Sequence, residues 1–409
     1  MSGAMGELEW LEGGITAVPG MFAAGLHCGI KPTAARDLAL IYSSAPATAA
    51  GVFTTNRIQG APVKVSKERL KSGVAQAIVA SSGCSNVCTG EQGLKDAREM
   101  TEAVARELRI PEVRVLVAST GIIGRYLPMD KIRPALPKLV KGLSPQPQGS
   151  RHAAEGIMTT DTHPKEAALR VEIGGRPITI GAIAKGTGMI HPMMATMFCF
   201  VATDLAVARD ALQAALRRAV TGSFNRISVD GDRSTSDTVV ILANGLVENR
   251  PLTRGDRRLR LFQTALDALT QRLAVMQVRD GEGATLVIDV HVRAAKTRRD
   301  AEVAARAIAN SPLFKTAMAG RDPNWGRVMS ALGASGIAVQ EERVGIWYGE
   351  EQVAAAGKPK EPVRWDRVKA ELAKPEIAVT VDLGLGSGHD HVWTCDLTQD
   401  YVKMNTGTS

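Results

Sequence analysis

The segment KGTGMIHPMMATMFCF, residues 185–200, is the most informative part of the sequence. Gly186 and Gly188 permit sharp turns, and the apolar run from Met197 onward predicts a buried strand. Between them, a small residue precedes a threonine at Ala195–Thr196. The pattern fits two interpretations: a loop that leads into a core strand, or a threonine nucleophile held at a strained peptide bond.

The second interpretation supplies a complete chemistry without a histidine. In a strained loop the hydroxyl of Thr196 can attack the carbonyl carbon of Ala195, and the peptide C–N bond breaks as an ester forms, which frees the α-amino group of Thr196. Hydrolysis of this ester then releases the carboxylate of Ala195 and restores the hydroxyl of Thr196. An α-amino group has a pKa of about 7.7–8.0, so it can act as the base for the hydroxyl of its own residue. Thr196 is therefore the candidate nucleophile, and Ala195–Thr196 is the candidate self-cleavage bond.

Outward from this segment, short apolar runs alternate with amphipathic ones. Alternating apolar residues over 286–292 predict a half-buried strand, and Gly174-Gly175 between two apolar runs predicts a hairpin over 171–180. The mixture favours a layered α/β fold with some antiparallel strands. The other predicted strands are 38–44, 76–81, 113–119 and 238–244, and the predicted helices are 94–108, 209–220, 258–278 and 301–309.

Composition narrows the class of protein. The chain has 409 residues, 44% hydrophobic and 22% charged, which is typical of a globular protein of about two or three domains. The net charge of +8 is diffuse and does not indicate nucleic-acid binding. No run of about 18 apolar residues predicts a membrane span, and the N-terminus lacks a signal-peptide pattern. The five cysteines indicate reduced thiols, so we expect a cytoplasmic protein.

Familiar cofactor and metal motifs are incomplete in this sequence. Gly186-Thr-Gly188 begins like a dinucleotide fingerprint, but His191 stands where the third glycine belongs. The Cys84–Cys88 spacing has no second cysteine pair, and the triplet His389–His391 stands alone in the sequence. We therefore expect no cofactor and no metal ion.

Several short blocks, in order along nearly the whole chain, make this sequence resemble the ornithine acetyltransferase (glutamate N-acetyltransferase) family of arginine biosynthesis. The segment 185–200 resembles the self-cleavage motif of that family. Any single block is weak, whereas the ordered series is specific. The other blocks are Gly29–Lys31, Gly51–Asn56, Ser82–Gly90, Ser119–Gly124, Leu127–Met129, Met158–Thr162, Ser223–Asp232, Asp280–Gly283, Lys315–Ala317, Asp322–Arg327 and Asp400–Asn405.

The resemblance implies a fold and a chain organisation. The fold would be a layered α/β core related to that of self-cleaving aminopeptidases, followed by a smaller C-terminal α/β domain. The core would span residues 1–280 and the C-terminal domain residues 281–409. Self-cleavage would give an alpha chain, 1–195, and a beta chain, 196–409, and two chains of each kind would form a heterotetramer.

The resemblance also implies site residues. Thr196 matches the nucleophile, while the hydroxyl of Thr120 and the backbone N–H of Gly121 match an oxyanion hole, which stabilises a tetrahedral oxyanion. Lys185 suits a substrate carboxylate, and Glu282 suits an amine or a proton-transfer role. The matched substrate contacts are Thr159, Lys185, Thr196, Glu282, Asn405 and Ser409, the last in a C-terminal tail one residue shorter than is usual in the family.

The implied reaction is a ping-pong transfer of an acetyl group. The group would pass from N2-acetyl-L-ornithine to Thr196 and then to L-glutamate, which gives ornithine and N-acetylglutamate. Some family members also accept acetyl-CoA as a donor. The expected partners are therefore small-molecule substrates, with no nucleic acid and no membrane.

Departures from the family pattern leave other functions open. Met193, Cys84 and Ser236 stand where the family usually has asparagine. One alternative is a self-processing aminopeptidase of related fold, which would release amino acids from peptides. Others are an acetyltransferase of secondary metabolism and a non-catalytic basic binding protein.

Overall fold

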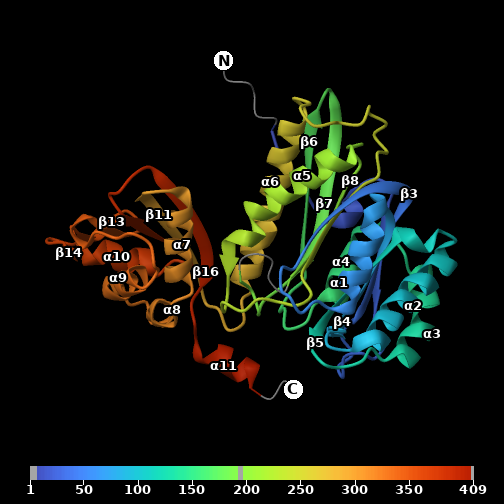
Figure 1. Ribbon diagram of the computed structural model, residues 1–409, viewed down its shortest axis with the longest axis horizontal. Coiled ribbons are helices and arrows are strands. Elements are labelled where there is room, and N and C mark those ends of the chain that lie inside the picture. The colour runs from blue at the N-terminus through green and yellow to red at the C-terminus, as the bar shows by residue number, and fades with distance from the viewer. Residues whose placement is uncertain (1–6, 192–196, 407–409) are drawn as a thin grey trace. The chain divides into compact units, whose positions relative to one another are not determined.

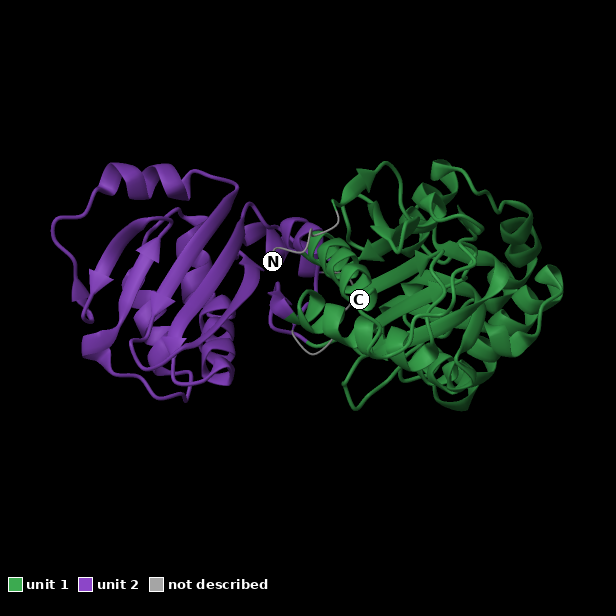
Figure 2. Ribbon diagram, turned by 90° about the horizontal axis from the view of Figure 1, so that it is seen from above, with its two compact units in different colours: residues 1–186, 193–225, 233–274 green, residues 187–192, 226–232, 275–409 purple. Residues whose placement is uncertain are grey.

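The structure is a computed structural model that describes residues 7–191 and 197–406 and has a mixed α/β fold (Figure 1). The chain forms two compact units (Figure 2). Unit 1 comprises Met1–Gly186, Met193–Asn225 and Arg233–Ala274, and unit 2 comprises Thr187–Pro192, Arg226–Asp232 and Val275–Ser409.

A nine-stranded sheet forms the centre of unit 1. The strand order is β1-β6-β7-β8-β10-β3-β4-β5, with β2 paired to β3. The pairs β8/β10 and β4/β5 are parallel and the others are antiparallel. The strands are β1 (Glu9–Leu11), β2 (Met21–Leu26), β3 (Leu38–Phe53), β4 (Val74–Cys84), β5 (Val115–Ile122), β6 (Lys165–Ile173), β7 (Arg176–Lys185), β8 (Phe198–Thr203) and β10 (Thr238–Ala243).

Helices cover both faces of this sheet. Because successive strand residues point to opposite faces, neighbours such as Leu40 and Ile41 belong to two separate apolar cores. One core contains side chains of α4, and the other contains side chains of α1, α2 and α3. The helices are α1 (Ala61–Arg69), α2 (Gly90–Leu108), α3 (Met129–Lys141), α4 (Pro147–Ile157), α5 (Arg209–Thr221) and α6 (Leu259–Arg279), whose last turn belongs to unit 2.

The strands that flank the informative segment pair directly with each other. β7 ends at Lys185 and β8 begins at Phe198, and these two residues are opposite each other in the antiparallel ladder. Every residue of β8 is buried, which confirms the strand predicted after Met197. The predicted hairpin over 171–180 is also confirmed, because β6 and β7 join at Gly174 and Gly175.

A second, seven-stranded sheet forms unit 2, in the order β14-β13-β12-β15-β11-β16-β9. Side chains of α7 to α10 pack with alternate strand residues, such as Val290 and Val292, on one face of the sheet. The strands are β9 (Ile227–Ser228), β11 (Val287–Ala295), β12 (Gly345–Tyr348), β13 (Glu351–Ala355), β14 (Lys358–Pro359), β15 (Glu376–Asp382) and β16 (Gly388–Cys395). The helices are α7 (Arg298–Ala309), α8 (Pro312–Ala319), α9 (Trp325–Gly333), α10 (Trp365–Leu372) and α11 (Gln399–Asn405).

The two compact units do not meet at a single boundary in the sequence. Residues 187–192, 226–232 and 275–280 lie inside the predicted first domain, 1–280, but belong to unit 2. The domain boundary at 280/281 stays a prediction. Within the described ranges, no helix combines the length and the apolar character needed to cross a membrane.

Candidate active site

A buried cluster of charges lies where β6 begins and β7 ends in unit 1. The carboxylate of Asp161 accepts a hydrogen bond from Lys165 Nζ at 2.7 Å, and Lys185 Nζ lies 4.0 Å from its other oxygen. Lys185 Nζ also donates to Thr159 Oγ1 at 2.8 Å. The structure therefore brings together Thr159 and Lys185, the two substrate contacts predicted for this part of the chain.

Backbone hydrogen bonds fix the central carboxylate of this cluster. The N–H groups of Thr159 and Gly186 donate to Asp161 at 3.0 and 2.8 Å. Burial alone would raise the pKa of Asp161, but the charges of Lys185 and Lys165 hold it down at about 2. Two lysines and one carboxylate leave one positive charge, which is suited to an anionic group of a substrate.

Thr120 and Gly121 lie at the end of β5, beside β4. In the parallel ladder Thr120 is opposite Ser82, and Gly121 is opposite Gly83. Gly121 has a φ of +125°, and a Cβ at this position would lie 2.4 Å from the carbonyl carbon of Gly83. Only glycine fits here, because the two backbones approach too closely for a side chain.

The start of β8 is anchored by a buried carboxylate. The backbone N–H of Met197, the residue that follows Thr196, donates to Asp237 Oδ1 at 3.0 Å, and the N–H of Thr238 donates to the carbonyl of Met197 at 3.1 Å. Burial raises the pKa of Asp237 to about 8, although the bond from Met197 and the charge of Lys185 oppose this shift. The predicted cleavage residues Ala195 and Thr196 lie outside the described residues.

The raised pKa of Asp237 predicts a pH-dependent stability. Between pH 4 and pH 8, roughly, folded Asp237 keeps a proton that the unfolded chain has released, so its contribution to stability falls as the pH rises. Asp237→Asn keeps an oxygen acceptor for Met197 and cannot ionise. We expect the melting temperature of this variant, relative to that of the wild type, to rise between pH 5 and pH 9. Thermal scans of both proteins in matched buffers measure this difference. Parallel profiles for the two proteins would contradict the assignment.

Glu282 and Asn405 contact each other in unit 2. Asn405 Nδ2, from α11, donates to Glu282 Oε2 at 2.6 Å, and the N–H of Glu282 donates to the carbonyl of Thr187 at 2.9 Å. A Cβ at Gly188 would lie 2.5 Å from the carboxyl carbon of Glu282, so the glycine makes room for the acid. These two predicted contacts are also brought together, whereas Ser409 lies outside the described residues.

Sequence reasoning missed the carboxylates that organise these groups. Asp161 and Asp237 were not proposed as site residues, and Asp230 was not either, although its carboxylate accepts from the N–H of Ile190 at 2.9 Å. Burial raises the pKa of Asp230 to about 6. A usable signal was present: Asp161 and Asp230 lie inside blocks that carry the family resemblance.

Comparison with known proteins identifies the chain. A family model described as the ArgJ family matches residues 22–408. The "Arginine biosynthesis bifunctional protein ArgJ" of Symbiobacterium thermophilum is 50% identical over 402 residues, which are 97% of this chain and 99% of the relative. The protein of the same name from Bacillus subtilis is 42% identical over 396 residues, 97% of this chain and 96% of the relative.

A solved structure is also similar. It is the ornithine acetyltransferase of Mycobacterium tuberculosis complexed with ornithine, 39% identical, with a TM-score of 0.43, over 46% of this chain and 98% of that chain. The protein is an enzyme of the acyltransferase class. Within that class, the chain belongs to the ArgJ family, which confirms the resemblance found in the sequence blocks.

Proposed function

We propose that this enzyme is a glutamate N-acetyltransferase. It moves an acetyl group from N2-acetyl-L-ornithine to L-glutamate, in the cytoplasm, as part of the cyclic route of arginine biosynthesis. The observation that carries the proposal is the buried Lys185 amine, held by Thr159 and Asp161 at the end of β7. Such a cation suits the α-carboxylate that both amino-acid substrates possess.

The proposed cycle uses Thr196 twice. After self-cleavage at Ala195–Thr196, the free α-amine accepts the proton of the Thr196 hydroxyl while the oxygen attacks the acetyl carbonyl of the donor. The carbon–nitrogen bond to ornithine breaks, and the amine leaves with the proton, so acetyl-Thr196 remains. The α-amine of glutamate then attacks this ester, and the hydroxyl is restored as N-acetylglutamate leaves.

Each of the two attacks on the acetyl carbonyl gives a tetrahedral intermediate with a negatively charged oxygen, which hydrogen-bond donors held in place before the reaction can stabilise. We assign the Thr120 hydroxyl and the Gly121 N–H to the oxyanion hole, since the close approach of β5 and β4 holds this backbone in place. Glu282 and Asn405 are proposed as further substrate contacts, and Ser409 as a contact from the C-terminus. We further propose a heterotetramer of two 1–195 chains and two 196–409 chains.

Acetyl-CoA is proposed as a second, weaker donor. Acetyl-Thr196 can be loaded by any acetyl donor that reaches the threonine. Acetyl-CoA has no carboxylate beside its acetyl group, however, and cannot use the charge of Lys185 as acetylornithine does. Transfer from acetylornithine should therefore dominate.

One incubation tests the proposed function. Purified enzyme is mixed with N2-acetyl-L-ornithine and L-glutamate, and free ornithine and N-acetylglutamate are measured by chromatography. We expect both products in equal amounts, and no sustained ornithine release when glutamate is omitted. Cleavage of dipeptide amides without acetyl transfer would instead identify a self-processing aminopeptidase.

Loss of one oxyanion donor should slow the chemical step. Thr120→Ala removes the hydroxyl and leaves the strand geometry unchanged, so we expect kcat to fall about 10²-fold with a normal melting temperature. Thr120→Ser keeps a hydroxyl and is the matched control. A loss below about threefold in steady-state assays of Thr120→Ala would remove Thr120 from the site.

A further inference from the structure

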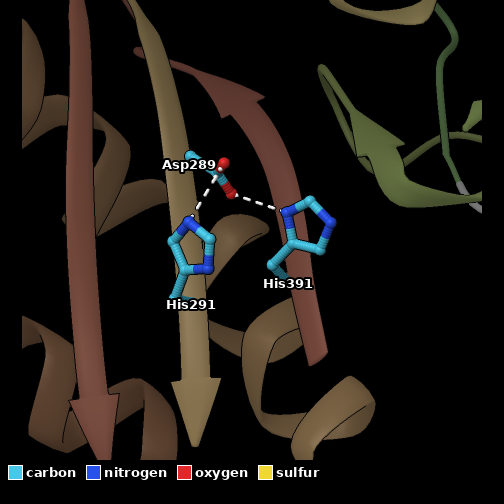
Figure 3. A group of neighbouring side chains, drawn as sticks. All are labelled: Asp289, His291 and His391. Carbon is cyan, nitrogen blue, oxygen red and sulfur yellow. Dashed lines mark hydrogen bonds and ion pairs between the residues drawn. The ribbon is translucent and has the colours of Figure 1, made fainter. Parts of the chain in front are cut away.

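Three side chains that can act as metal ligands lie together on one face of the unit 2 sheet. Asp289 and His291 are two residues apart on β11, and His391 on β16 is directly opposite His291 in the antiparallel ladder (Figure 3). Their neighbours Val290 and Val292 are buried in the apolar core. Because side chains alternate along a strand, Asp289 and His291 point away from that core.

The three side chains are already in mutual contact. Asp289 Oδ1 lies 2.9 Å from His391 Nδ1, and Asp289 Oδ2 lies 3.1 Å from His291 Nε2. The two imidazole rings are stacked, with centroids 5.1 Å apart and planes 12° apart.

We propose that Asp289, His291 and His391 form a binding site for one divalent transition-metal ion such as Zn²⁺. Zinc lies about 2.0–2.2 Å from imidazole nitrogen and carboxylate oxygen, so two ligands of a tetrahedral ion are roughly 3.3 Å apart. The two measured separations are within a few tenths of an ångström of that spacing. All the ligand atoms of the cluster lie within 4.8 Å of one another, so a movement of the side chains would bring the three ligands to the spacing that an ion requires.

The chemistry of the donors selects the class of metal. Two imidazoles and one carboxylate suit zinc, nickel and copper, whereas magnesium and calcium prefer sites made of oxygen alone. Three protein ligands leave a fourth position for water or another molecule. The site is accessible, since the side chains of His291 and His391 are 45% and 24% exposed.

This site is separate from the residues proposed for acetyl transfer. None of Asp289, His291 and His391 is among the predicted catalytic or substrate-binding residues, so the inference does not depend on the proposed function. The ion would link β11 to β16 through their side chains. In the sequence His391 stands near His389, whereas Asp289 and His291 lie about a hundred positions earlier. The pairing of β11 with β16 brings them beside His391.

Calorimetric titration of the full chain with ZnCl₂ tests the proposal. The protein is first freed of metal, and its accessible thiols are alkylated because Cys88 is exposed and could bind zinc. We expect one ion per chain with a micromolar Kd, and no binding of MgCl₂. His291→Ala and His391→Ala should each weaken binding at least tenfold, and Asp289→Asn should weaken it less.

A neighbouring histidine supplies the matched control. His389 lies two residues before His391 on the same strand and is exposed, but it does not belong to the cluster. His389→Ala should leave the Kd unchanged. The proposal is overturned if the wild type binds no zinc, if both cluster variants bind as well as the wild type, or if His389→Ala causes the same loss.

A measurement on the unaltered protein does not depend on the folding of any variant. Crystals soaked in ZnCl₂ and measured at the zinc absorption edge should show an anomalous peak about 2.0–2.2 Å from both imidazoles and the carboxylate. A peak found only at other residues would contradict the assignment.

Discussion

Thr196→Ala should remain one chain of 409 residues and should transfer no acetyl group. The wild type, cut after Ala195, should give chains of 195 and 409 − 195 = 214 residues, which run as two bands in a denaturing gel. N-terminal sequencing of the second chain should begin Thr-Met-Phe. The variant lacks the oxygen for both the cleavage and the transfer, and loss of a nucleophile costs about 10⁶-fold in rate.

A conservative variant separates the nucleophile from a structural threonine. Thr196→Ser keeps a hydroxyl, so it should still cleave and still transfer acetyl, at lower rates. Mass spectrometry of the wild type during turnover should find an acetyl group on the new N-terminal residue. A wild type that is active while every chain stays uncut would refute the self-cleavage scheme.

Lys185→Met should have the second largest effect, on transfer from acetylornithine. Removing one partner of a buried ionic contact with a substrate lowers kcat/KM by about 10²–10³-fold. Loading from acetyl-CoA should fall much less, because that donor presents no carboxylate to the lysine. Steady-state rates with each donor, on wild type and variant, measure the difference.

Lys165→Met is the control for this prediction. Lys165 is buried and bonds the same carboxylate, Asp161, at 2.7 Å, but it is not a predicted substrate contact. If Lys185 serves only to neutralise Asp161, the two variants should lose the same activity with both donors. A loss specific to Lys185 and to acetylornithine supports carboxylate recognition, provided that both variants melt near the wild-type temperature.

The sequence pattern predicted strands best where a run consists mainly of apolar residues. The apolar segment that forms β10 was predicted over 238–244 and spans Thr238–Ala243, and the apolar strand predicted after Thr196 is β8, which begins at Phe198. β3 was predicted over 38–44 but extends over Leu38–Phe53. Residues 43–51 of this strand are small or polar around Pro46, and the pairing of β3 with β4 shifts register between Tyr42 and Ala47. These features weaken the strand pattern.

For the candidate site, the sequence predicted several residues but not the carboxylate that connects them. Family blocks located Thr159, Lys185, Glu282 and Asn405, and the structure places the first two in contact and the last two in contact. Composition could not reveal that Asp161 is the shared partner of two lysines. That role exists only after β6 and β7 pair, because the pairing brings Lys165 and Lys185 to the same end of the sheet.

The strand order of unit 1 has a consequence for the protein after cleavage at 195/196. β8 and β10 would then belong to the second chain, yet they lie between β7 and β3 of the first chain. Two antiparallel ladders, β7/β8 and β10/β3, would join separate molecules through backbone hydrogen bonds, and the side chains of β8 and β10 would share an apolar core with the first chain. The sheet would thus stay whole after the cut. The two chains would separate only when the protein is denatured. Each fragment, expressed by itself, would lack the neighbours that complete its own strands.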